Sequence, residues 1–329
     1  MPLDRFGREI DYLRISVIDN CNLRCVYCMP LEGLRFSPPA ELLTPAEIEL
    51  VGRAAVATGF RRVRLTGGEP TLRADLLEII ERLVSIPGLG DVAMTTNGVL
   101  LPKLAGDLRR AGLRRVNIHI DTLNAQRLRQ IMRWGDLARI WAGIEAAEAA
   151  GLTPIKLNTV VARDYNDADV EALAALTLKR DWHVRFIELM PLGTDDAART
   201  ARDRYVSNRD TRRRIETALG ALEPLPSQNP SDESRNFRLP NAVGIVGFIS
   251  PVSEPYCGSC NRMRLTADGR FHLCLLNDDE LDVRAAIRSG GGIEDVRAIL
   301  LRAVGAKPTG HALHRGVSTE HRDMYQLGG

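Results

Sequence analysis

A repeat of strand-like and helix-like segments runs through the first two thirds of the chain. Short segments rich in Val, Ile, Leu and Phe are each followed by a segment with helical periodicity. The expected strands span residues 12–18, 61–65, 91–95, 115–120, 154–161 and 182–189. Strands about 30 residues apart, with a helix between them, connect in parallel through right-handed crossovers. The repeat therefore predicts an α/β fold built on a parallel sheet.

The expected helices follow these strands at residues 44–58, 75–85, 102–111, 124–150 and 168–178. The first of them has the clearest beginning. Thr44 is a favourable N-cap residue, Pro45 suits the first helical position, and Glu47 stands where a capping box requires it. Periodicity alone does not decide whether the sheet is open or rolled into a barrel.

Polar motifs stand directly after several of the expected strands. Three cysteines follow the first strand, TGGEP follows the second, TTNG ends the third and DTLN follows the fourth. In open α/β sheets and in barrels alike, ligands bind at the carboxyl ends of the parallel strands. The functional site is therefore expected at that edge of the sheet.

The strand–helix repeat ends near residue 190. Residues 195–238 are rich in Arg, Asp, Ser, Asn and Pro, with one expected helix at 208–219, and this composition indicates a mobile or surface connection. A strand at 242–249, a hairpin that turns at Asp268-Gly269, helices at 281–288 and 293–304 and a polar tail follow. We expect one domain over residues 1–225 and a second over 226–329.

The formal net charge is only +2, because 44 Lys and Arg residues are balanced by 42 Asp and Glu residues. This balance disfavours nucleic-acid binding through bulk electrostatics. The first residues lack a basic stretch followed by an apolar one, and no run of about 18 apolar residues occurs, so neither export nor a membrane span is expected. We expect a cytoplasmic protein.

The six cysteines form two groups of three, one with CxxxCxxC spacing and one with a CxxC pair and a later third thiol. The groups are Cys21, Cys25 and Cys28, and Cys257, Cys260 and Cys274. In a reducing compartment such groups are more typical of metal sites than of disulfides. Three thiolates suit a 4Fe–4S cluster that keeps one iron open for another ligand.

Two other interpretations of the cysteines stay open from the residues alone. Zinc needs a fourth ligand, and the nearest candidate for the second group is His272, two residues from Cys274. Buried free thiols are the ordinary state of single cysteines. Two compact groups in loops beside glycine and tyrosine favour metal sites over that ordinary state.

Together these motifs resemble the radical S-adenosylmethionine (SAM) enzymes and, among them, the molybdenum-cofactor biosynthesis protein A family, the GTP 3′,8-cyclases. The matching segments follow one another along almost the whole chain: CNLRCVYC, RLTGGEPTLR, TTNGVLL, RVNIHIDTL, IKLNTVV, VRFIELMPLG and CGSCNRMRLTADGRFHLCL. The resemblance implies an incomplete (β/α)6 TIM-like radical SAM barrel closed by a smaller α+β C-terminal region. It also implies SAM and two 4Fe–4S clusters as cofactors, with one cluster on each cysteine group.

The chemistry implied by this resemblance is a radical cyclisation. SAM bound at the first cluster yields a 5′-deoxyadenosyl radical that abstracts H3′ of GTP, and the sugar radical then attacks C8 of guanine. The residues implied for SAM binding are Tyr27, Gly68, His119 and Met190. His119 departs from the family pattern, which has serine at this position.

The residues that the resemblance implies for GTP binding are Arg14, Arg64, Thr95, Lys156, Arg262, Met263 and Arg264. Arg14 and Arg64 alternate with apolar residues inside strands, where a charge is costly unless an anion neutralises it. A triphosphate is such an anion, and a salt bridge to Glu69 or Asp121 is the alternative. Catalytic roles are implied for Arg14, Arg262, Arg264 and the Gly328-Gly329 tail, which would reach into the active-site cavity.

The expected partners are GTP, a reductant such as flavodoxin or ferredoxin, and the cyclic pyranopterin monophosphate synthase that takes the product. A homodimer is compatible with the resemblance. Two other functions stay open, namely a peptide-modifying radical SAM enzyme with an auxiliary cluster and a non-catalytic iron–sulfur electron carrier.

Overall fold

Six parallel strands form the centre of the protein, seen in a computed structural model that describes all residues except 193–194, 228, 230, 314–318, 320 and 329. The strands are β1 (Tyr12–Ser16), β2 (Arg62–Thr66), β3 (Asp91–Thr96), β4 (Arg115–His119), β5 (Lys156–Val161) and β6 (His183–Glu188). Each strand pairs in parallel with the next one along the chain. The predicted α/β fold is confirmed, and each expected strand begins within two residues of an observed one.

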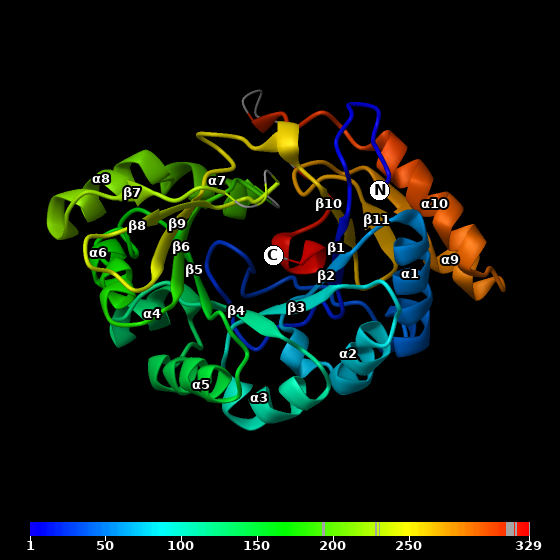
Figure 1. The fold of residues 1–329 in the computed structure, drawn as a ribbon, viewed down its shortest axis with the longest axis horizontal. Coiled ribbons are helices and arrows are strands. Elements are labelled where there is room, and N and C mark those ends of the chain that lie inside the picture. Colours follow the sequence, from blue (N-terminus) through cyan, green and yellow to red (C-terminus); the bar gives the residue numbers. More distant parts are fainter. Residues whose placement is uncertain (193–194, 228, 230, 314–318, 320, 329) are drawn as a thin grey trace.

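Helices cover the outside of this sheet (Figure 1). They are α1 (Pro45–Thr58), α2 (Leu76–Val84), α3 (Leu101–Arg110), α4 (Ala125–Met132), α5 (Leu137–Ala149) and α6 (Val170–Ala174). The predicted capping box of α1 is confirmed, because the Glu47 N–H donates to Thr44 Oγ1 at 3.2 Å and the Thr44 N–H donates to the Glu47 carboxylate at 2.7 Å. Within the described residues, none of the helices combines the length and the apolar composition that a bilayer crossing needs.

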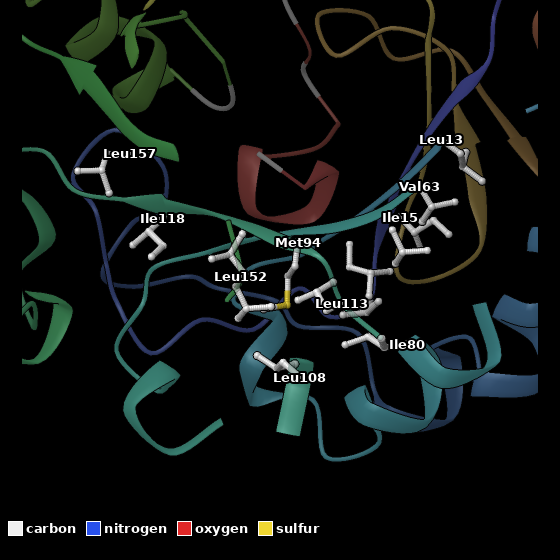
Figure 2. Packing of buried hydrophobic residues seen from close by; sticks show 14 of the residues in the cluster. Leu13, Ile15, Val63, Ile80, Met94, Leu108, Leu113, Ile118, Leu152 and Leu157 are labelled. Atoms are coloured by element: carbon white, nitrogen blue, oxygen red, sulfur yellow. The ribbon is translucent and has the colours of Figure 1, made fainter. Parts of the chain in front are cut away.

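The hydrophobic core lies between the outer face of the sheet and these helices. Figure 2 shows Leu13 and Ile15 of β1 and Val63 of β2 on the side of the sheet that faces Ile80 of α2. All four side chains are buried. Because successive strand residues point to opposite faces, the residues between them point into the barrel. The outer face of the sheet thus stabilises the fold, and the inner face is free to carry a site.

The C-terminal third adds strands to both edges of the six-stranded sheet. β9 (Ile245–Ile249) pairs in parallel with β6, and β10 (Arg262–Leu265) pairs in parallel with β1. β8 (Arg235–Arg238) and β7 (Glu223–Pro224) extend one edge, and β11 (Arg270–His272) and β12 (Glu280–Asp282) extend the other. The outermost strands β7 and β12 do not pair in the described structure, so the expected incomplete barrel is confirmed.

Beyond β6, the described part of the chain forms five further α-helices: α7 (Asp195–Asp203), α8 (Asn208–Leu219), α9 (Arg284–Arg288), α10 (Ile293–Ala306) and α11 (Met324–Leu327). Helix α10 packs beside α1, whereas α11 lies inside the barrel (Figure 1). The prediction of a single helix within 195–238 is wrong, because this polar segment also forms α7, β7 and β8. Asn208 shows how such a segment is held, since its buried side-chain amide donates to the Ile249 carbonyl at 2.8 Å.

Candidate active site

All six cysteines border one cavity inside the barrel. The first group lies in the loop after β1. Two members of the second group lie in the loop between β9 and β10, and the third follows β11. Every one of the six is a free thiol and is half-buried. The fold therefore brings two groups that are far apart in the sequence into one chamber, and the first group sits at the predicted strand edge.

Backbone contacts hold the first cysteine loop in place. The Val26 N–H donates to the Ile131 carbonyl at 2.9 Å, which ties the loop to the end of α4. On the other side, the N–H of Gly68 donates to the Ile18 carbonyl at 2.7 Å. A Cβ on Gly68 would lie 2.2 Å from the Asn20 carbonyl oxygen, so only glycine permits this approach. The requirement for glycine here follows from packing against the cysteine loop, whether or not SAM also contacts it.

The thiols of the first group resist ionisation. Burial is the main cause, and it raises the pKa of Cys21 to about 11 and the pKa of Cys28 to about 12. The pKa of Cys25 is raised well above its ordinary value, by burial and then by the neighbouring thiol. Carboxylates near the three thiols add to these shifts: Glu69, Asp121 and Asp323. The first group therefore lies in an apolar and acidic environment.

The second group lies in a basic environment. Burial alone would raise the thiol pKa of Cys260, but Lys307 and Arg262 outweigh it and lower this pKa to about 7. His311 likewise lowers the pKa of Cys257 through a hydrogen bond, against the effect of burial. The third cysteine of the group keeps a raised pKa, because burial outweighs the same lysine. Lys307 and His311 were not identified from the sequence.

The arrangement of the thiols fits iron–sulfur clusters better than zinc. His272, the candidate zinc ligand, is fully buried with its Nδ1 3.1 Å from a Glu280 carboxylate oxygen, and it does not border the cavity. Within the described residues, no three His, Cys, Asp or Glu side chains converge closely enough to hold one metal ion. Thiols that each bind a different iron of a cluster do not need to converge in that way.

Three of the residues expected at SAM form a wall beside the first group. Tyr27, His119 and Met190 all border the cavity. The Tyr27 hydroxyl donates to Asp121 Oδ2 at 2.5 Å and lies 2.7 Å from His119 Nε2. Asp121 Oδ2 also lies 3.1 Å from His119 Nε2. One carboxylate thus fixes both the imidazole and the phenol. A serine at position 119 would have a much shorter side chain with which to contact this carboxylate.

A row of arginines crosses the inner face of the sheet. Arg264 of β10, Arg14 of β1 and Arg64 of β2 stand opposite one another in strand register. All three border the cavity, as does Arg262, which lies two residues before Arg264 in β10. Like charges directly opposite each other on neighbouring strands are destabilising unless something neutralises them. This row therefore needs negative charge beside it.

One carboxylate in the described structure reaches this row, and it comes from the segment predicted to be a connection. Glu233 accepts two hydrogen bonds from Arg14, at 2.7 and 2.9 Å, and a further one from Arg262. These two guanidinium groups hold the pKa of Glu233 well below its ordinary value, although burial opposes the shift. The alternative that the strand arginines pair with Glu69 or Asp121 is wrong, because Glu69 instead accepts from Thr96 and from the Asn97 N–H.

Cation donors in the barrel remain in excess of this one carboxylate. Nitrogen atoms of Arg14, Arg185 and Arg262 are buried without a hydrogen-bond partner in the described structure. Burial lowers the pKa of Arg185 to about 10 and that of Lys156 to about 8, and in both cases neighbouring arginines add to the effect. Arg185 was missed from the sequence, although it alternates with apolar residues in β6 as Arg14 does in β1.

The structure does not bring every expected GTP residue to the cavity wall. Thr95 borders the cavity. Lys156 lies at the start of β5, near Arg64 and Arg185, but does not border the cavity. Met263 is fully buried in the core on the other face of β10, so its side chain points away from the arginine row.

The chain end enters the barrel beside the arginine row. Arg264 donates to the carbonyl of Leu327 at 3.3 Å and also to that of Gly328. Gly328 has φ +74°, and a Cβ there would lie 2.2 Å from Thr66 Oγ1, so the position suits only glycine. Gly329 lies outside the described residues.

Comparison with known proteins gives a consistent assignment. Residues 15–177 match the radical SAM superfamily model, and residues 182–313 match the model described as Molybdenum Cofactor Synthesis C. The chain is 47% identical to the GTP 3′,8-cyclase of Pelotomaculum thermopropionicum and 45% identical to that of Moorella thermoacetica. Each alignment covers 99% of this chain and 99% of the relative.

A solved structure supports the fold. The Streptococcus suis protein SuiB, in a crystal structure with S-adenosylmethionine bound, aligns with a TM-score of 0.56 at 15% identity. The alignment covers 84% of this chain and 63% of the other. At this identity the likeness concerns the fold alone.

Proposed function

Because the chain belongs to the GTP 3′,8-cyclase family of the radical SAM superfamily, we propose that it converts GTP to (8S)-3′,8-cyclo-7,8-dihydroguanosine 5′-triphosphate. This reaction is the first step of molybdenum cofactor biosynthesis, in keeping with the second family model that the chain matches.

The observation that carries this proposal is the row of arginines on β10, β1 and β2. Of the three registered guanidinium groups and Arg262 beside them, Arg14 and Arg262 bond the Glu233 carboxylate, whereas Arg264 bonds backbone carbonyls. Buried cations in such excess require a polyvalent anion. The triphosphate of GTP supplies the negative charge, and planar guanidinium groups bind phosphate oxygens in pairs. A phosphate that binds Arg14 or Arg262 must compete with the Glu233 carboxylate.

The first cysteine group would hold the cluster that binds SAM, and the second group would hold a cluster on the substrate side. When bound, the first cluster and SAM supply the radical that removes H3′ of the substrate. The side chains of the protein would hold the reactants in position. The shared Asp121 carboxylate fixes Tyr27 and His119 on the SAM side. The carbonyl of Gly328 fixes Arg264 on the substrate side, which gives the tail a role in orienting that guanidinium. Fixed geometry of this kind replaces a random encounter of reactants.

The reaction also needs partners. We infer an external one-electron reductant of the flavodoxin or ferredoxin type and a cyclic pyranopterin monophosphate synthase that takes the product. A homodimer stays compatible with the family resemblance. The two-domain division at residue 225 and the cytoplasmic location stay predictions. β7 and β8 lie on opposite sides of this proposed boundary in the sequence, and they pair with each other in one sheet.

The test is anaerobic reconstitution with iron and sulfide, followed by incubation with SAM, GTP and dithionite. We expect 5′-deoxyadenosine and 3′,8-cyclo-GTP in equal amounts by liquid chromatography and mass spectrometry. SAM cleavage without any effect of GTP would favour a peptide-modifying radical SAM enzyme. Two reconstituted clusters without SAM cleavage would favour an electron carrier.

A further inference from the structure

An exposed tryptophan lies beside the first cysteine loop. Trp134 follows α4 and is 61% exposed, although its ring lies only 4.8 Å from the guanidinium carbon of Arg24. Arg24 is buried within the cysteine loop and donates to the Cys21 carbonyl at 2.5 Å and to the Leu23 carbonyl at 2.8 Å. A single side chain therefore separates a solvent-exposed aromatic ring from the backbone of a cluster ligand.

The same contacts fix the surroundings of this tryptophan. The Arg24 N–H donates to the Met132 carbonyl at 3.4 Å, so the end of α4 (Figure 1) packs directly against the cysteine loop. Arg24 also lies 5.7 Å from the ring of Phe36, which brings residues 35–36 to the same place. An exposed ring and the loop around a metal ligand thus form one continuous surface.

Positive charge surrounds this exposed ring. Arg35 and Arg129 are exposed and Arg133 is half-buried, and none of them forms an ion pair within the described residues. Arg129 lies in the last turn of α4, and Arg133 is the residue that ends this helix, with φ +55° and one guanidinium nitrogen that is buried without a hydrogen-bond partner in the described structure. Along the chain, Glu32 and Asp136 are the acids nearest to these arginines, and Asp136 is engaged as the N-cap of α5. We call Arg35, Arg129, Arg133 and Trp134 the Trp134 patch.

We propose that the Trp134 patch is the docking surface for a small acidic ferredoxin that reduces the cluster on Cys21, Cys25 and Cys28. This inference rests on the proposed function, because only a radical SAM enzyme needs an electron at that place. One electron leaves the ferredoxin cluster, which becomes oxidised, and enters the cluster on the first cysteine group, which becomes reduced.

Several features of the patch match such a partner. Unpaired arginines attract an acidic protein and accelerate its encounter. Trp and Arg are the residue types that most often dominate the binding energy of an interface. Ferredoxins carry electrons at low potential on clusters held by cysteine thiolates. Arg24 and the Cys21 backbone provide a direct contact path from this surface toward the cysteine loop.

The test compares two electron sources on the same reconstituted enzyme. In one arm, a purified ferredoxin with its reductase and NADPH drives the reaction; in the other arm, dithionite does. For Trp134→Ala and for Arg129→Glu we expect the ferredoxin-driven rate to fall by about tenfold or more, as loss of an interface anchor does. The dithionite-driven rate should stay at the parent value, because dithionite needs no docking site.

Binding is measured separately from turnover, by thermophoresis with the same ferredoxin. The Kd should rise about tenfold for both variants, and the parent affinity should fall steeply with salt. Arg302→Glu is the matched control, because Arg302 is equally exposed but lies on α10, which packs beside α1. It should leave both rates and the Kd unchanged.

Four results would overturn the proposal. Equal loss in both arms would make Trp134 a support of the cysteine loop, and unchanged ferredoxin affinity would place the docking surface elsewhere. Support of the parent by a flavodoxin but not by the ferredoxin would exclude the named partner. Conversion of a dimer to a monomer by Trp134→Ala would assign the patch to a second copy of the chain. Failure of the proposed function is distinguishable, since the parent would then make no product with dithionite.

Discussion

The two cysteine groups share one cavity but lie in opposite electrostatic environments. Burial and neighbouring carboxylates raise the thiol pKa values of the first group, two of them to about 11 and about 12. Around the second group, Lys307 and Arg262 lower the pKa of Cys260 to about 7, and His311 lowers that of Cys257. Two similar groups of three cysteines thus lie in an acidic half and in a basic half of the same barrel.

Clusters held by the two cysteine groups would therefore lie in different surroundings, which suits two different tasks. The potential of an iron–sulfur cluster depends on the charges and hydrogen bonds around its sulfurs. Carboxylates near the first group favour a low potential, which suits delivery of an electron to SAM. Cations near the second group favour ionised thiols and anionic ligands, which suits a substrate with a triphosphate. The predictions that follow test this contrast from the largest expected effect to the smallest.

Removing the first cysteine group and removing the second should abolish different steps of the reaction. With all three thiols of the first group changed to serine, we expect SAM cleavage to fall to background. With Cys257, Cys260 and Cys274 changed to serine, weak SAM cleavage should persist while GTP binding and cyclisation are lost. Iron content, 5′-deoxyadenosine and cyclised product are measured on both variants. Product formation at the parent rate without the second group would refute its assignment to the substrate.

Gly328→Ala tests whether the tail orients the substrate half of the cavity. A Cβ would collide with Thr66 Oγ1, so the tail must leave its position and Arg264 loses its acceptors. We expect product formation to fall by about 100-fold, the size of a misplacement of about 1 Å at a reacting centre. Both clusters and SAM binding should be retained. Gly305→Ala in α10 is the control, because a Cβ there meets nothing within 4 Å.

Lys307→Met sharpens the contrast by removing a cation from the basic half. Lys307 is buried and donates to the Leu273 carbonyl at 2.7 Å, while its charge lowers the pKa of Cys260. Without it the pKa of Cys260 rises, so protons compete better with iron and loading of the second group shifts to higher pH. Loss of such a supporting group costs about 10–100-fold in metal affinity. Iron retention is measured against a chelator in a background without the first group, with the exposed Lys103→Met as control. Equal retention from pH 6 to 9 in both proteins would contradict this account.

Glu233→Gln tests the competition between a protein carboxylate and the substrate. The amide keeps the shape of the side chain but lacks the charge that pairs with Arg14 and Arg262. We expect the KM for GTP to fall by about tenfold, equivalent to about 1.4 kcal/mol. The melting temperature should also fall, because buried arginines lose a partner. Glu254→Gln, at the more exposed pair with Arg235, should change neither quantity. A higher KM would mean that Glu233 contacts the substrate directly.

His119→Ser tests the acidic half and should have the smallest effect. Burial alone would lower the pKa of His119, but Asp121 outweighs burial and raises it. Below that raised pKa the imidazolium faces the cationic SAM, so SAM affinity should increase by a few-fold as the pH rises through this raised pKa, which lies above the ordinary value of about 6.5. The serine variant should bind SAM with no pH dependence and still cleave it. Flat affinity in the parent over the same range would exclude a titrating His119.

The features that the sequence predicted well are those set by local rules. The capping box of α1 depends on Thr44 and Glu47 alone, and strand alternation puts Arg14 and Arg64 on one face. The same alternation could have identified Arg185, which the sequence analysis missed, and could have excluded Met263, which it expected at the substrate. Arg185 in VRFIEL obeys the rule that selected Arg14, and Met263 between two cavity-facing arginines must face away from the cavity.

The features that the sequence did not reveal depend on long-range packing. Glu233 stands in a polar segment, and it reaches the arginine row because β8 pairs with β9. Lys307 and His311 reach the second cysteine group because the segment after α10 folds back over it. Arg8 holds that segment by donating to the carbonyls of Cys257 and Pro308. Contacts between residues about 300 positions apart leave no local signal in composition or periodicity.

The pairing of β9 and β10 with opposite edges of the sheet has a consequence for how the chain folds. Only residues 250–261 separate these strands, and this stretch carries Cys257 and Cys260. The six central strands can assemble during synthesis, but the β6 edge stays unpaired until Ile249 has emerged and the β1 edge until Leu265 has emerged, which exposes these edges to aggregation. One short segment then joins the two strands that cover these edges, and it carries two of the three thiols of the second cysteine group. We therefore expect the yield of folded protein to depend on iron supply. A cluster bound by Cys257, Cys260 and Cys274 would hold this segment to Cys274. The late pairing of strands that are distant in the sequence would then no longer be in equilibrium with the unpaired precursor.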